Sequence, residues 1–135
     1  MTAATELVFD ASAVFRGLTT RGDAAGLLDQ LGRAEIVGHA PDVIVAELAN
    51  AVAVSVRVER RSLAEAEQLF EDFVASPLVL YPTKPMAAPA IDLAVRTGLS
   101  AYDAFYAVLA TTLDVPLVTA DRKLAAAVPG SVLVT

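Results

Sequence analysis

The sequence predicts an α/β domain with a mostly parallel sheet of about five strands. Short apolar runs alternate along the chain with longer segments of helical spacing, an order that is typical of parallel sheets. The runs are apolar throughout rather than alternately apolar and polar, as expected for strands that are covered on both faces. The length of 135 residues suits one domain, so we expect a single domain over residues 1–135.

The first half of the chain is expected to pass twice from strand to helix. In order, we expect a strand at Glu6–Phe9, helices at 10–18 and 23–34, a strand at Glu35–Gly38 and a long helix that begins at Pro41. Leu27, Leu28 and Leu31 lie on one side of the second of these helices. Proline suits the first position of a helix. The many valines after Pro41 would also suit a strand, but the length of the segment, its alanines and its charged end favour a helix.

The second half of the chain continues the alternation. In order, we expect a helix at Ser62–Ser76, a strand at Leu78–Tyr81, helices at 86–97 and 99–113, a strand at Pro116–Ala120, a short helix at 122–128 and a strand at 131–135. Ser62 and Glu65 have the spacing of a capping box at a helix start. Gly98 has the position of a residue that ends a helix.

The composition excludes several kinds of site. There is no cysteine, which excludes disulfides and thiolate metal sites, and the single histidine, His39, leaves little material for a zinc site or a Ser-His-Asp triad. We interpret His39 as structural. No run reaches the roughly 18 apolar residues of a membrane span, and the first residues lack the pattern of a signal peptide. We therefore expect a soluble cytoplasmic protein, in which the apolar content of 56% leaves some apolar surface for partners.

Four carboxylates border apolar segments. Asp10 and Asp121 directly follow expected strands, and open parallel sheets form their sites outside the carboxyl ends of the strands. Asp103 lies in the first turn of its helix and Glu47 in the second turn of the long helix after Pro41. Each also has a purely structural interpretation: the three aspartates could cap helices, and Glu47 could lie on a solvated edge.

Taken together, the four acids favour a metal site. Burial of unpaired carboxylates is costly, so clustered carboxylates imply cations, and oxygen-only ligands suit Mg²⁺ or Mn²⁺. The net charge of −6 argues against broad, non-specific binding of nucleic acid. Leaving four metal-binding carboxylates out of the count changes the net charge to −2, which weakens that objection.

The sequence resembles the PIN-domain family and, within it, the VapC-type toxins of bacterial toxin–antitoxin pairs. The matching segments cover nearly the whole chain in the right order: "LVFDASAV", "PDVIVAELANAV", "SAYDAFYAVLA" and "LVTADRKL". The resemblance implies a three-layer α/β/α sandwich and a metal-dependent endoribonuclease. Its acidic positions map onto Asp10, Glu47, Asp103 and Asp121, which would be the catalytic and metal-binding residues. Its hydroxyl positions map onto Ser12 and Thr119, which would orient carboxylates or waters.

The resemblance also implies partners and a mechanism. One or two Mg²⁺ or Mn²⁺ ions can activate water and neutralise charge at phosphorus without a histidine base. We expect an RNA substrate in a single-stranded loop, a cognate antitoxin and a homodimer. Some relatives carry a further acid where this chain has Lys123, so a second ion would be weakly held or completed by the RNA. Arg16, Arg122 and Lys123 could touch phosphates or be ordinary surface charges. Tyr102, Phe105 and Tyr106 could stack on bases, although core packing is the better interpretation.

Two alternatives stay open from the sequence. A phospho-acceptor receiver domain has similar size and acidic strand ends, but the third expected strand leads into "YPTK" without an acid. A degenerate PIN domain would bind RNA or partners without cleaving, and the presence of all four acids argues against it.

Overall fold

The computed structural model describes residues 5–135, which contain a five-stranded sheet in the order β3-β2-β1-β4-β5. Every neighbouring pair of strands is parallel. The strands are β1 (Thr5–Phe9), β2 (Ile36–Pro41), β3 (Leu78–Tyr81), β4 (Leu117–Thr119) and β5 (Val132–Leu133). The predicted α/β class and parallel sheet are confirmed. A receiver domain has β1 between β2 and β3, the doubly wound order 2-1-3-4-5, so the strand order contradicts that alternative.

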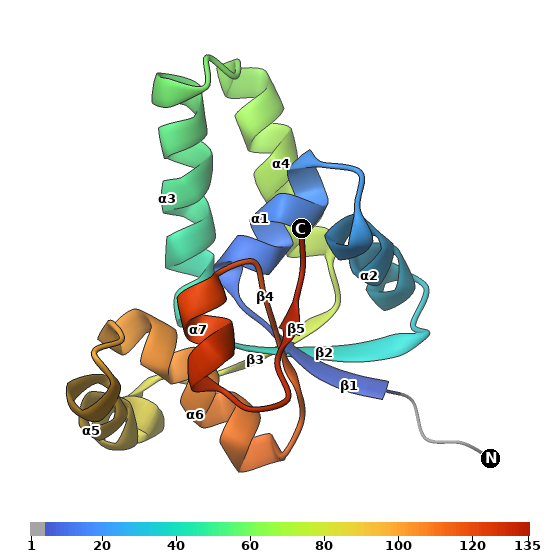
Figure 1. Cartoon of the computed structure of the whole chain (residues 1–135). Coiled ribbons are helices and arrows are strands. Elements are labelled where there is room, and N and C mark those ends of the chain that lie inside the picture. Colours follow the sequence, from blue (N-terminus) through green and yellow to red (C-terminus); the bar gives the residue numbers. More distant parts are fainter. Residues whose placement is uncertain (1–4) are drawn as a thin grey trace.

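Helices cover both faces of the sheet. They are α1 (Ala11–Thr19), α2 (Asp23–Gly32), α3 (Val43–Val58), α4 (Leu63–Ala75), the 3₁₀ turn η1 (Lys84–Met86), α5 (Ala87–Thr97), α6 (Ala101–Leu113) and α7 (Arg122–Ala127). Figure 1 shows α1 and α2 on one side of the sheet, α5 and α6 on the other, and α3 and α4 as a pair that projects away from it. α6 packs against β1, β2 and β4 and forms most of its side of the core. No helix in the described part of the chain has the length and apolarity that a membrane crossing requires.

The order and type of the predicted elements are confirmed, but the start of the long helix is wrong. Pro41 is the last residue of β2 instead of the first residue of a helix, and α3 begins at Val43. The register of β2 with β1 ends at His39, so Pro41 pairs only with Tyr81 of β3. A proline at the end of a strand removes no hydrogen bond from the central ladder. The strand therefore extends into residues that sequence spacing assigned to a helix.

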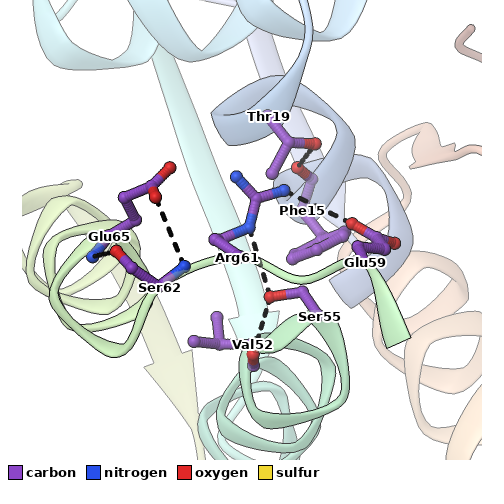
Figure 2. Close-up of polar contacts among 8 residues, drawn as sticks. All are labelled: Phe15, Thr19, Val52, Ser55, Glu59, Arg61, Ser62 and Glu65. Carbon is purple, nitrogen blue, oxygen red and sulfur yellow. Dashed lines mark hydrogen bonds and ion pairs between the residues drawn. The ribbon is translucent and has the colours of Figure 1, made fainter. Parts of the chain in front are cut away.

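The turn between α3 and α4 is held by polar contacts (Figure 2). The predicted capping box forms: the Glu65 N–H donates to Ser62 Oγ at 3.1 Å, and the Ser62 N–H donates to Glu65 Oε1 at 3.3 Å. Arg61 Nε donates to the buried hydroxyl of Ser55 at 3.2 Å. These contacts tie the C-terminal end of α3 to the start of α4.

Two helices, α1 and α2, approach unusually closely at Gly17. A Cβ at this position would lie 2.6 Å from Leu28 Cδ1 and 2.9 Å from the Ala24 carbonyl oxygen, so any larger residue would force the two helices apart. This close packing holds α1 over the sheet. α1 begins one residue after Asp10, which caps the helix at its other end.

Candidate active site

Two of the four acids meet at the carboxyl ends of adjacent strands. Asp10 follows β1, Asp121 comes two residues after β4, and the Asp10 N–H donates to the Val118 carbonyl at 3.1 Å. Both side chains also cap helices: Asp10 accepts from the Ala13 N–H at the start of α1, and Asp121 accepts from the first turn of α7. The capping interpretation of these two residues is therefore correct. The capping bonds use only Oδ1 of each carboxylate, so Oδ2 can have a further role.

Asp10 is the most enclosed acid of the site, with 4% of its surface exposed. Its Oδ1 accepts hydrogen bonds from Ser12 Oγ and the Ala13 N–H, both at 2.8 Å. Its Oδ2 accepts from Thr119 Oγ1 at 2.6 Å. Three donors thus hold this carboxylate in one orientation.

The hydroxyls of Ser12 and Thr119 join the two strand ends. Thr119 Oγ1 donates its single proton to Asp10 and accepts the Asp121 N–H at 3.0 Å. Ser12 Oγ donates to Asp10 and accepts the Ala120 N–H at 3.0 Å. Each hydroxyl is used both as donor and as acceptor, so its orientation is determined. The position of both hydroxyls beside Asp10 fits the orienting role expected for them.

Glu47 and Asp103 come from helices rather than strand ends. Glu47 lies in the second turn of α3, and its Oε1 accepts a 2.6 Å hydrogen bond from Tyr106 Oη of α6. In α6 the Ser100 hydroxyl accepts the Asp103 N–H at 3.1 Å. The reciprocal half of a capping box, which forms in α4, is not formed by Asp103 among the described residues. The Asp103 carboxylate interacts instead with the Ser100 side chain, and this hydrogen bond lowers the pKa of Asp103.

Tyr106 takes part in the candidate site in a way that the sequence did not predict, since core packing was the favoured interpretation and base stacking the alternative. The core prediction is correct, because 1% of its surface is exposed, but its hydroxyl also fixes Glu47. Burial and the Glu47 charge raise the pKa of Tyr106 and keep it a neutral donor. Residues three apart share a helix face, which places Tyr106 beside Asp103, but its contact with Glu47 depends on how α3 and α6 pack.

The charges of the four acids act on one another. Burial raises the pKa of Asp10, and the Asp103 charge adds to this, while hydrogen bonds from Thr119, Ala13 and Ser12 oppose it. Burial also raises the pKa of Glu47, and the charges of Asp103 and Asp10 raise it further. The pKa of Asp103 is raised by burial and by the Asp121 charge, against the lowering effects of Ser100 and Lys123. The structure therefore brings all four predicted acids into one electrostatic cluster.

The donor set fits a hard divalent cation that keeps much of its own water. Within residues 5–135, no group of three or more acidic, histidine or cysteine side chains is arranged to hold a metal ion by itself. Mg²⁺ is usually held by one or two carboxylates together with waters, not by an all-protein cage. The mutual repulsion of Asp10, Glu47 and Asp103 is the charge pattern that such a cation would relieve.

The basic residues near the acids have different surroundings. Lys123 Nζ donates to the Gly98 carbonyl at 3.1 Å, and its charge lowers the pKa of Asp103. Arg16 and Arg122 are exposed. His39 has the structural role predicted for it: Nε2 lies 2.8 Å from Glu6 Oε1, and Nδ1 lies 2.7 Å from Tyr81 Oη, so the ring links three neighbouring strands.

Comparison with known proteins identifies the family. The family model for the PIN domain matches residues 7–128. Ribonuclease VapC1 of Mycobacterium tuberculosis is 35% identical over 127 residues, which cover 93% of this chain and 92% of the relative. Ribonuclease VapC9 of the same organism is 31% identical over 118 residues, 87% of each chain.

Solved structures agree with the fold. The crystal structure of PAE2754 from Pyrobaculum aerophilum has a TM-score of 0.74 and 26% identity, and covers 95% of this chain and 83% of its own. VapBC2 from Rickettsia felis, solved bound to a DNA fragment from its promoter, has a TM-score of 0.65 at 17% identity and covers 96% of this chain and 97% of its own. The chain therefore belongs to the PIN-domain family and, within it, to the VapC ribonucleases.

Proposed function

We propose that this chain is an endoribonuclease that depends on Mg²⁺ or Mn²⁺ and acts as the toxin of a toxin–antitoxin pair. The ribonuclease class follows from family membership. The observation that supports the metal dependence is the cluster of Asp10, Glu47, Asp103 and Asp121. Burial and the charges of neighbouring acids in this cluster raise the pKa values of Asp10, Glu47 and Asp103. Such a cluster is costly without cations and suits a reaction at phosphorus that needs them.

The four acids have distinct tasks in this proposal. Asp10, held by three donors, and Glu47, held by Tyr106, would be direct or water-mediated ligands, as would Asp103. Asp121 completes the site, and Ser12 and Thr119 keep Asp10 oriented. A bound divalent cation lowers the pKa of its water and neutralises charge that develops on the phosphate. The protein would contribute rigid carboxylates whose positions do not change during the reaction.

Two protein partners belong to the proposal: a small antitoxin and a second copy of this chain. Large apolar side chains stay exposed on the helices away from the sheet, in agreement with the predicted apolar surface. They include Val54 and Val58 of α3, Leu63 and Val74 of α4, and Ile91 and Val95 of α5. Exposed apolar surface of this kind is typical of interaction sites. The structures similar to this fold include VapBC2 and FitAB. We place the activity in the cytoplasm, where RNA is available.

Exchange of one carboxylate for an amide tests the proposal. Asp103→Asn keeps the shape of the side chain but removes its charge, and Asp29→Asn makes the same change at an exposed position of α2. We expect cleavage of a structured RNA by the unmodified chain in Mg²⁺ or Mn²⁺ and none in EDTA. Asp103→Asn should lower the rate by more than about 10–100-fold, the loss typical of disturbing a metal site. It should also abolish the metal-induced rise in melting temperature.

The control and the alternatives give distinct results. Asp29→Asn should cleave like the unmodified chain. Cleavage that persists in EDTA would contradict the metal dependence. RNA binding without cleavage under any metal condition would favour the degenerate, binding-only interpretation.

A further inference from the structure

A pocket of about 470 Å³ opens beside Glu47, between the N-terminal half of α3 and the first turn of α6. Its lining consists of Val43, Ala46, Glu47, Asn50, Ala51 and Tyr102. The volume falls within the roughly 300–1,000 Å³ of pockets that hold small organic groups. Because Glu47 belongs both to this pocket and to the acid cluster, the pocket adjoins the site where the phosphate would be cut.

Helix geometry explains why these residues meet. Val43, Glu47 and Asn50 are spaced by four and three residues, so they lie on one face of α3. On α6, Tyr102 precedes Asp103 and lies four residues before Tyr106, whose hydroxyl holds Glu47. The contact that fixes the Glu47 carboxylate thus also fixes the distance between the two walls of the pocket.

The chemistry of the lining selects the kind of group that it can hold. Val43, Ala46 and Ala51 are small and apolar, and Tyr102 offers an aromatic ring that is 60% exposed. The Asn50 amide supplies both a donor and an acceptor. The only charged lining residue is the Glu47 carboxylate, which repels a phosphate. A flat, neutral heterocycle with hydrogen-bonding edges fits this combination.

We propose that Asn50 and Tyr102 form a subsite for one unpaired nucleobase of the RNA, next to the phosphate that is cut. Tyr102 stacks on the base, and Asn50 forms hydrogen bonds with its edge, the two interactions by which proteins hold single-stranded RNA. The subsite rests on the proposed ribonuclease function, because the adjoining phosphate must lie at the four carboxylates. The expectation that Tyr102 packs in the core is wrong, because 60% of its surface is exposed. The subsite explains why this ring lies at the surface.

Two substitutions separate stacking from recognition of the base edge. Loss of a stacked aromatic side chain weakens binding about 5- to 150-fold, so Tyr102→Ala should raise KM by that factor for a single-stranded 10-mer and leave kcat nearly unchanged. Tyr102→Phe keeps the ring and should behave like the unmodified chain. Asn50→Ala should reduce the differences in KM among oligo(A), oligo(C) and oligo(U). Asp29→Asn, a change at an exposed position of α2 outside the pocket, is the control and should alter neither constant.

A spectroscopic measurement reports on the ring without cleavage. The chain has no tryptophan and three tyrosines, of which Tyr106 is buried and Tyr81 is bonded to His39. Titration with the same RNA in EDTA should therefore quench mainly the emission of Tyr102, and Tyr102→Phe should lose most of the quenching.

The outcomes distinguish the subsite from the function on which it rests. If the unmodified chain cleaves RNA but Tyr102→Ala and Asn50→Ala have unchanged KM values and base preference, the subsite is overturned and the ribonuclease stands. If Tyr102→Ala instead loses self-association in sedimentation with an unchanged KM, the ring contacts a second copy and the subsite is again overturned. An unmodified chain that does not cleave RNA in any metal overturns the proposed function itself.

Discussion

At the scale of single residues, the hydroxyl of Thr119 links the segments that carry Asp10 and Asp121. The side chain is fully buried, and its one proton is committed to Asp10 while its oxygen accepts the Asp121 N–H. The two acids that follow neighbouring strands are thereby held by a single atom. The site depends on this hydroxyl even though Thr119 touches neither substrate nor metal in the proposed reaction.

Replacement of Thr119 by valine should show this dependence. Thr119→Val keeps the shape of the side chain but leaves Asp10 Oδ2 and the Asp121 N–H without their partner. We expect the free energy of unfolding to fall by about 1–3 kcal/mol, the cost of unsatisfied buried polar groups, together with a loss of RNA cleavage. Urea denaturation and a cleavage assay check the two effects. Thr119→Ser retains the hydroxyl and should restore most of both; equal behaviour of the two variants would contradict the argument.

Several residues of the site could be placed from the sequence, and others could not. The rule that parallel strands end at one edge of the sheet predicted the meeting of Asp10 and Asp121. The contact of Tyr106 with Glu47 was not predictable, because it joins α6 to α3 and depends on how these helices pack. Spacing also could not tell exposed Tyr102 from buried Tyr106, since both lie on the same face of one helix.

At the scale of elements, the junction of α5 and α6 determines where Asp103 lies. α5 ends at Gly98, which has the left-handed conformation with φ of 77°, as its predicted role at a helix end requires. The Gly98 carbonyl also accepts from Lys123 Nζ of α7. One glycine therefore turns the chain into α6 and ties that turn to the segment after β4.

A pair of glycine substitutions tests this junction. Gly98→Ala places a Cβ in a left-handed conformation, which should lower the free energy of unfolding by roughly 1–2 kcal/mol. Gly26→Ala makes the same change inside α2, at an exposed position where a Cβ meets no atom within 4 Å. It should stabilise the protein by about 0.4–1 kcal/mol. Thermal or urea unfolding of both variants checks the opposite signs; the same sign for both would contradict the role of the Gly98 conformation.

Boundaries of helices and strands were predicted correctly where they depend on neighbouring residues, and wrongly where they depend on pairing with a distant strand. The capping box at Ser62 and the glycine at position 98 were predicted correctly, because each signal is contained in a few adjacent residues. The start of α3 was predicted wrongly, because Pro41 belongs to β2 only through its pairing with Tyr81, 40 positions later. A rule based on neighbouring residues cannot identify a pairing partner so far along the chain.

At the scale of the whole molecule, the acid cluster should make stability depend on pH. The pKa values of Asp10, Glu47 and Asp103 are raised above the ordinary values of 3.8 and 4.5. An acid with a raised pKa contributes stability that is complete below its unfolded-state pKa and is lost as the pH rises through its folded-state pKa. In EDTA, the melting temperature should therefore rise as the pH falls from 7 toward about 4.5. Asp23 and Glu65 have lowered pKa values and lose their contribution only at more acidic pH.

Bound metal should oppose this trend. Metal ions compete with protons for carboxylates, so the stabilisation by Mn²⁺ should grow as the pH rises. Melting curves between pH 4.5 and 8, with and without Mn²⁺, should diverge toward high pH. Asp103→Asn should flatten the slope in EDTA. Parallel curves with and without Mn²⁺ would contradict a metal site formed by this cluster.

The hydrogen bond from Thr119 to Asp10 joins residues that lie 109 positions apart in the chain. A polypeptide is made from its N-terminus at about 5–20 residues per second, so the second half of the site leaves the ribosome about 5–20 s after the first. During that interval β1 has no β4 beside it, and Asp10 lacks the donor that orients it. The nascent chain therefore lacks a complete site for most of its synthesis, and the site can form only when nearly the whole chain has been made.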